Sequence, residues 1–132
     1  MPSRQVIEAT VAKMDGFSAA GDMRSWAGFF SADAKFTNSA LPEPVMGRDA
    51  IMEMAGNWPR FRNELEWRII EGSRMVIGWR EHQLYDDGGT SGWYRGMSTF
   101  VFDSDGNVKE YEGVFDLLAL QAALQRPGST KP

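Results

Sequence analysis

Two side chains that could do chemistry stand two positions apart in an apolar, strand-like segment. Arg80 and His82 follow the apolar run 75–79, and His82 is the only histidine of the chain. Because side chains alternate across a β-strand, both are expected on one face, roughly 6–7 Å apart. A buried guanidinium and imidazole cost free energy unless they are paired or used. The pattern predicts a site in which Arg80 binds an oxygen anion and His82 transfers a proton.

The opposite face of the same segment is also apolar over its first half, through Met75, Ile77 and Trp79. Alternation by itself therefore leaves a second arrangement open. In that arrangement Arg80 and His82 face solvent, and the other face carries Trp79, Glu81 and Gln83.

Further candidates lie on other strand-like segments. Asn38 precedes a proline-containing stretch, where it is either a donor at a pocket mouth or a turn residue. Tyr111 could hydrogen-bond a ligand or a structural partner, and Gly113 leaves room for a ligand or for strand curvature. Arg95 could lie in the pocket or at its rim. The expected catalytic set is His82, Arg80 and Asn38, and the expected substrate-binding set is Phe36, Trp93, Arg95, Met97, Tyr111, Gly113 and Phe115.

These residues must be positioned by helices that come first and strands that follow. Apolar spacing and helix-ending residues predict helices over 4–20, 22–31, 47–56 and 117–125. Strand-like segments cover 34–38, 65–71, 75–85, 93–102 and 108–115, joined by hairpin signals, so the sheet should be mostly antiparallel. The order predicts an α+β fold with helices on one face of a curved sheet. Residues 1–126 are expected to form one domain, followed by a flexible tail over 127–132.

Composition excludes several classes of function. A net charge of −4 and scattered arginines give no electrostatic footprint for nucleic acid, and no run approaches the ~20 apolar residues of a membrane span. The chain has no cysteine and no apolar signal segment at its N-terminus, so we expect a cytoplasmic protein. One histidine argues against a zinc site. Residues 103–107 resemble the start of a calcium loop, but Val108 and Val114 replace its glycine and glutamate, so we expect no metal.

The order of elements and several short motifs resemble the nuclear transport factor 2-like superfamily. Within it, the chain is most similar to the branch of SnoaL-like polyketide cyclases and limonene-1,2-epoxide hydrolases. The matching segments are 21–22, 29–30, 33–34, 36–38, 41–44, 47–50, 79–82 and 114–117. The resemblance covers about residues 5 to 120 and implies a cone-like fold, with three N-terminal helices packed on a strongly curved sheet. It implies a pocket between the concave sheet face and the helices.

By this resemblance, Arg80 takes the place of the hydrolase's arginine between two catalytic aspartates, and Asn38 that of its water-binding asparagine. His82 and Gly113 stand where the two aspartates would be, and Phe36 replaces a water-binding tyrosine. Since the second carboxylate is gone, activation of a water nucleophile is expected to be impaired. One acid–base group beside an arginine suits proton transfer on a carbon acid, or an elimination, better than hydrolysis.

We therefore expect a cofactor-independent acid–base enzyme of the isomerase, cyclase or lyase type, including dehydration or retro-aldol cleavage, acting on a small apolar ring-containing molecule. One alternative is epoxide hydrolysis with a rearranged pair such as His82 and Asp15, although Asp15 reads better as a solvated aspartate. Another is a non-catalytic ligand-binding or interaction module. A homodimer is expected, because Phe100 and Phe102 would be exposed if their strand face were the convex one.

Overall fold

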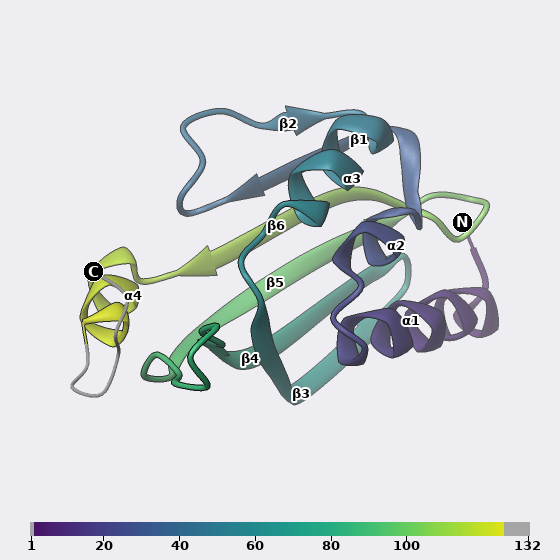
Figure 1. The fold of residues 1–132 in the computed structure, drawn as a ribbon. Coiled ribbons are helices and arrows are strands. Elements are labelled where there is room, and N and C mark those ends of the chain that lie inside the picture. The colour runs from purple at the N-terminus through teal and green to yellow at the C-terminus, as the bar shows by residue number, and fades with distance from the viewer. Residues whose placement is uncertain (1, 126–132) are drawn as a thin grey trace.

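A computed structural model describes residues 2–125, and Figure 1 shows its elements. Three helices come first, interleaved with two strands, and four long strands and a final helix follow. The helices are α1 (Arg4–Ala19), α2 (Met23–Ala27), α3 (Arg48–Gly56) and α4 (Leu117–Leu124). The strands are β1 (Phe30–Asn38), β2 (Val45–Met46), β3 (Phe61–Glu71), β4 (Arg74–Gln83), β5 (Tyr94–Phe102) and β6 (Val108–Phe115).

Helix α1 begins where the sequence pattern predicts it. The Ser3 hydroxyl accepts a hydrogen bond from the backbone N–H of Val6 and caps the first turn. Ile7, Val11 and Met14 form its buried face, and Gly21, with a φ of 76°, lies just past its end. The apolar face of α1 packs on the sheet.

The second helix is shorter than its pattern predicts. Asp22 caps α2 through the N–H of Ser25, but the helix ends at Ala27 and the chain enters β1 at Phe30. Phe30 is fully buried and pairs with Val108 on β6, so burial in the sheet outweighs the local helical pattern. The predicted strand 34–38 is therefore the second half of a longer strand.

The six strands form one mixed sheet in the order β2-β1-β6-β5-β4-β3. Neighbours pair antiparallel except β1 and β6, which are parallel. In β3 the register shifts between Leu65 and Trp67, and a bulge of this kind bends a strand. Because of the shift, Leu65 and Arg68 both lie on the same, concave side of the sheet.

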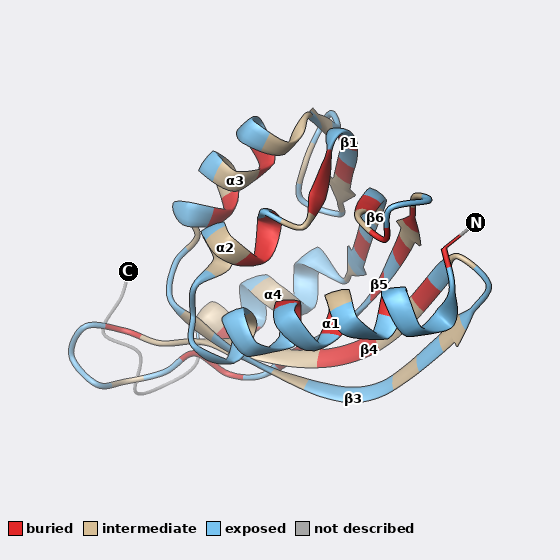
Figure 2. Ribbon diagram, turned by 90° about the vertical axis from the view of Figure 1, so that its right-hand side faces the viewer, coloured by how far each residue is buried: buried red, intermediate tan, exposed pale blue. Residues whose placement is uncertain are grey.

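The sheet curves strongly around the helices, as Figure 2 shows for β3 and β4 passing around α1. The core lies between its concave face and α1, α2 and α3, with Ile7, Phe36 and Ile51 among its fully buried side chains. Phe100 and Phe102 belong to this core and are buried. The expectation that they might be exposed on a convex face was wrong, because the helices cover that part of β5.

The α+β, cone-like prediction is confirmed, with three N-terminal helices on a curved, mostly antiparallel sheet and a short C-terminal helix. The two-residue strand β2 was not predicted, because Val45 and Met46 are too short a run to show alternation. The predicted tail at 127–132 lies outside the described residues.

Candidate functional site

A cavity of about 450 Å³ lies between the concave sheet face and helices α1, α2 and α4. This volume falls in the range of small-molecule pockets. Most of its wall is apolar or aromatic, including Trp26, Trp58, Leu65, Met75, Ile77, Trp79, Phe100, Phe115 and Leu120. Its polar side chains are Asp15, Ser18, Asn38, Asn63, Arg68, Glu81, Gln83, Tyr94, Ser98 and Tyr111. The chemistry of the cavity rests on these few groups.

Glu81 places a carboxyl group in this apolar wall. Tyr94 donates a hydrogen bond of 2.5 Å to Glu81 Oε2, and Asn63 Nδ2 donates one of 3.1 Å to Oε1. Pairing of β3 and β5 with β4 brings both donors beside Glu81. Burial raises the pKa of Glu81 above its usual value, although the hydrogen bonds from Tyr94 and Asn63 oppose that shift. A carboxyl group with a raised pKa is a stronger base than an ordinary glutamate, which suits a group that takes a proton and returns it.

The hydroxyl of Tyr94 stays protonated and therefore acts as a donor. Burial and the nearby charge of Glu81 raise its pKa far above the usual tyrosine value. Helix α4 closes the cavity at this end, since Ala123 packs with Trp79 and Tyr94 in a small buried cluster. The carboxyl group thus lies under a helical cover.

A second set of hydrogen bonds crosses the cavity floor. Trp79 Nε1 donates to Ser98 Oγ at 2.9 Å, and Ser98 Oγ lies 2.8 Å from the hydroxyl of Tyr111. The Tyr111 ring stacks on Phe36, with centroids 4.4 Å apart and planes 10° apart. Burial raises the pKa of Tyr111 to about 12, and the charge of Glu81 adds to the shift. Tyr94 and Tyr111 both line the cavity.

Two glycines make room for the aromatic floor. A Cβ at Gly113 would lie 3.0 Å from the Tyr111 hydroxyl, and one at Gly96 would lie 2.4 Å from the Trp79 ring. The Tyr111 ring lies beside Gly113 and the Trp79 ring beside Gly96, so a larger side chain at either glycine would push the ring aside. The space beside the predicted site residue Gly113 is therefore filled by the Tyr111 side chain and is not open to a ligand.

Asn38 lines the cavity, and it is also a turn residue. Its Oδ1 accepts hydrogen bonds from the N–H groups of Ala40 and Leu41, at 2.9 and 3.1 Å. This arrangement stabilises the turn that follows β1. Since its oxygen is occupied, the part of Asn38 left to contact a ligand is the amide nitrogen.

Asp15 and Arg68 form an ion pair at the cavity margin. Arg68 Nη2 donates to Asp15 Oδ1 and Oδ2 at 2.8 and 3.0 Å, linking α1 to β3. The Asp15 side chain is about half exposed, so it is both a wall residue and a solvated one. The Nε atom of Arg68 is buried and has no hydrogen-bond partner among residues 2–125.

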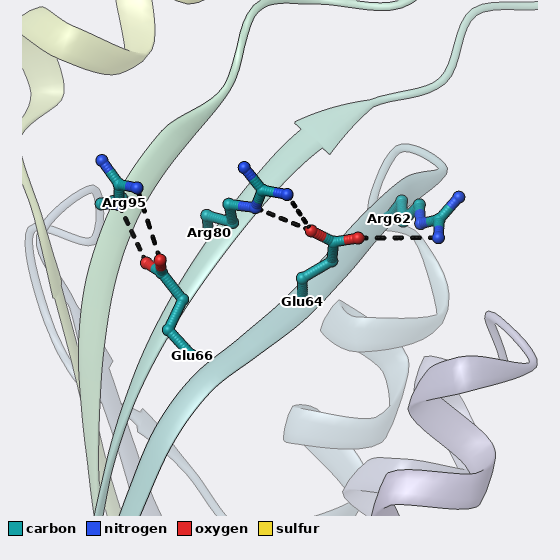
Figure 3. Close-up of polar contacts among 5 residues, drawn as sticks. All are labelled: Arg62, Glu64, Glu66, Arg80 and Arg95. Carbon is teal, nitrogen blue, oxygen red and sulfur yellow. Dashed lines mark hydrogen bonds and ion pairs between the residues drawn. The ribbon is translucent and has the colours of Figure 1, made fainter.

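The prediction that Arg80 and His82 point into the cavity is wrong. The cavity residues of β4 are Met75, Ile77, Trp79, Glu81 and Gln83, so alternation turns Arg80 and His82 to the outer face. There Arg80 donates to Glu64 Oε1 at 2.7 Å through Nε, and Arg62 approaches the other oxygen of Glu64 at 3.6 Å. Figure 3 shows these contacts.

His82 is accommodated on the outer face by an aromatic contact. Its ring stacks on Trp93, with centroids 3.9 Å apart, and the Arg80 guanidinium lies 4.3 Å from the centroid of the Trp93 ring. Burial lowers the pKa of His82, and the charges of Arg62 and Arg80 lower it further. His82 is not among the residues that line the cavity, and this position removes it from the proton-transfer role.

Three predicted substrate-binding residues also lie on the outer face, namely Trp93, Arg95 and Met97. Arg95 makes a two-pronged contact with Glu66, at 2.9 and 3.4 Å, and Met97 is exposed (Figure 3 shows the arginine). The structure does bring together the other predicted residues, Phe36, Asn38, Tyr111, Gly113 and Phe115.

Glu81, Tyr94, Asn63 and Ser98 were not among the predicted site residues. One signal could have found Glu81: the apolar face of Met75, Ile77 and Trp79 continues onto it at the same alternation. Following the apolar face, rather than the rarest residue type, would have selected the inner side of β4.

Within residues 2–125, the His, Asp and Glu side chains do not gather in a group of three or more that could bind a metal ion. In the same part of the chain, none of the helices combines the length and apolar composition that a membrane crossing requires.

Comparison with known proteins agrees with this fold. The model of the SnoaL-like domain matches residues 11–111, and no curated protein gives a significant match. One similar solved structure is that of the epoxide hydrolase/cyclase-like enzyme SalBIII, described as having a role in pyran ring formation in the polyether salinomycin. The two share 12% sequence identity and a TM-score of 0.75, over 90% of this chain and 97% of that one, which establishes a shared fold. The chain belongs to the SnoaL-like domain family of the nuclear transport factor 2-like superfamily.

Proposed function

We propose that this chain is a cofactor-independent acid–base enzyme that isomerises or cyclises a small, apolar, ring-containing molecule, with Glu81 as the group that moves the proton. The observation that carries the proposal is the Glu81 carboxyl group, held by Tyr94 and Asn63 in a cavity whose wall is mostly apolar. Asp15, the other carboxylate of the cavity wall, is occupied by Arg68. Glu81 is therefore the better placed proton acceptor.

The chemistry follows from two groups that face one space. Ionised Glu81 takes a proton from a C–H or O–H group of the substrate and returns it at a second atom, so that no co-reactant is consumed. Ser98 accepts a hydrogen bond from Trp79, so its own hydrogen can go to Tyr111, whose hydroxyl can then donate to a substrate oxygen that gains negative charge. General acid–base help from one residue contributes typically ~10²–10⁴-fold.

The substrate class follows from the cavity wall. Aromatic and aliphatic side chains dominate it, and its volume of about 450 Å³ lies in the range of pockets for small molecules. The description of SalBIII as an enzyme of pyran ring formation supports ring closure as one of the reactions to test.

A direct experiment uses two probe substrates, a β,γ-unsaturated cyclic ketone and an epoxy alcohol able to close a six-membered ring. Both are incubated in ¹⁸O-labelled water, and products are identified by NMR and mass spectrometry. We expect the conjugated ketone or the cyclic ether, without solvent oxygen, and a loss of at least about 100-fold in Glu81→Gln. Glu64→Gln, the same change on the outer face, is the matched control.

The other outcomes replace the proposal by a named alternative. A vicinal diol that carries ¹⁸O would identify an epoxide hydrolase. Recovery of a bound cavity ligand chemically unchanged would identify a binding module. Full turnover in Glu81→Gln would remove Glu81 from the mechanism.

We also propose that the outer sheet face forms a homodimer contact. Trp67, Met97 and Val114 lie in one row across β3, β5 and β6, because Gly78 joins Trp67 to Met97 in the register of the sheet. Trp67, Met97, Val114 and nearby Ile69 are 42%, 49%, 50% and 60% exposed. The flanking residues of Figure 3 carry both charges, so the face is complementary to a second copy of itself in a twofold arrangement.

A cytoplasmic location stays a prediction.

A further inference from the structure

Arg68 is the cationic side chain among the residues that line the cavity. We propose that Arg68 binds a carboxylate at the end of the substrate remote from the reacting carbon, so that the substrate is an elongated apolar acid. This inference rests on the proposed function, since it assigns a substrate class to the same cavity.

The hydrogen bonding of Arg68 leaves it able to accept such a ligand. Only Nη2 contacts Asp15, whereas Nη1 donates to no acceptor among the described residues. A guanidinium binds carboxylates through its N–H groups, and such charge-assisted hydrogen bonds are stronger than neutral ones. A ligand carboxylate would accept a hydrogen bond from Nη1, which the described residues leave without an acceptor.

The arginines of the outer face differ from Arg68 in their contacts and in their position. Arg80 and Arg95 each use Nε to bind a glutamate, at 2.7 Å to Glu64 and 2.9 Å to Glu66. Arg68 alone of these three keeps Nε free of a protein acceptor, and it alone lines the cavity. Arg68 is thus distinguished as a candidate ligand-binding residue by its position in the cavity wall, since all three residues are arginines.

The separation of Arg68 from Glu81 sets the length of the substrate. Arg68 pairs with Ile77 on β4, and Glu81 lies four residues further along the same strand, which corresponds to roughly 13 Å. The wall between them is apolar, through Leu65, Ile77 and Trp79. A molecule that reaches both ends therefore carries its acid group at one end, an apolar ring system in the middle and its reacting carbon near Glu81.

The test compares two probes of equal length, biphenyl-4-carboxylate and the neutral 4-phenylbenzyl alcohol. Binding is measured at neutral pH by calorimetry and by quenching of tryptophan fluorescence, with mutual competition to show that both occupy one cavity. We expect the carboxylate to bind wild-type protein at least about tenfold more tightly than the alcohol. Arg68→Met should weaken carboxylate binding about 10- to 100-fold and change alcohol binding less than about twofold.

Two further variants keep the outcome interpretable. Arg95→Met removes an arginine from the outer face and should leave both affinities unchanged. Asp15→Asn removes the competing carboxylate, so it should strengthen carboxylate binding several-fold even if Arg68→Met folds poorly.

Equal binding of the two probes to wild-type protein, or equal loss of both in a folded Arg68→Met, would overturn the inference. The same holds if neither probe binds. Turnover in Glu81→Gln decides the proposed function separately, so the two can fail independently.

Discussion

The hydroxyl of Tyr94 donates a 2.5 Å hydrogen bond to Glu81 inside an apolar cavity. The bond joins neighbouring strands, because Tyr94 on β5 pairs directly with Glu81 on β4. It stabilises the ionised carboxylate, while burial favours the neutral acid, and burial prevails. Because burial and the hydrogen bond oppose each other, the charge state of Glu81 responds to small changes in its surroundings.

The raised pKa of Glu81 predicts how stability depends on pH. Because the folded state holds this proton more tightly than the unfolded state, Glu81 favours folding most at low pH. That contribution is lost as pH rises from the unfolded pKa through the higher folded one. Glu81→Gln cannot ionise, so its melting temperature relative to wild type should rise between pH 4 and pH 8. Thermal unfolding across this range provides the measurement, and a difference that does not change with pH would contradict the assignment.

Removal of the Tyr94 hydroxyl should move the pH dependence of the reaction. In Tyr94→Phe the ionised carboxylate loses a donor, so the pKa of Glu81 rises further. A hydrogen bond to a charged group is worth ~1.5–3 kcal/mol, which corresponds to roughly one to two pH units. The acid limb of kcat/KM should shift upward by about that amount. Tyr85→Phe, a buried tyrosine outside the lining of the cavity, should leave the limb in place.

The glycine beneath Tyr111 should be intolerant of a methyl group. In Gly113→Ala the added carbon would lie 3.0 Å from the Tyr111 hydroxyl and 3.4 Å from Asn38 Cβ. Displacement of the ring should cost about 1–3 kcal/mol of unfolding free energy, as overpacking does in well-packed cores. Gly16→Ala, on helix α1 with nothing within 4 Å, should instead stabilise by roughly 0.5–1 kcal/mol. Denaturant titration of both variants checks the contrast, and similar effects of the two would show that Tyr111 is not held by Gly113.

A charge on the outer face should separate the proposed dimer. Ile69→Lys places an ammonium group beside the apolar row of Trp67, Met97 and Val114, where a second copy would bury it. Sedimentation velocity should show a dimer for wild-type protein and a monomer for this variant. Leu118→Lys, at a 75% exposed position of α4 away from this face, is the control and should remain dimeric. A monomeric wild-type protein would contradict the proposal at once.

Much of the fold could be predicted because its signals are local. Apolar spacing located α1 and α3, and alternation with turn residues located the four long strands, within a few residues of their observed bounds. Phe30 was misassigned to a helix because its partner, Val108, lies far along the chain. Local pattern carries no information about such a partner.

The candidate site was harder to predict than the fold, since both faces of β4 carry apolar as well as charged or polar residues. Alternation correctly grouped Arg80 with His82, and Trp79 with Glu81, but it assigned neither pair to the cavity. The stacking of His82 on Trp93 and the ion pair of Arg80 with Glu64 make the outer face a stable place for both. Each contact joins β4 to a residue outside it, and no property of residues 75–83 alone reveals it.

The sequence by itself determined the family, the order of most elements and, outside the bulge in β3, which residues of the long strands share a face. Those properties follow from short-range periodicity, which can be recognised without knowing which strands pair with one another. Only the tertiary structure decided which face of β4 is concave, because the choice depends on the bulge in β3, the rings lying over Gly96 and Gly113, and the helices that cover one side. That choice placed Glu81 in the cavity and left His82 outside.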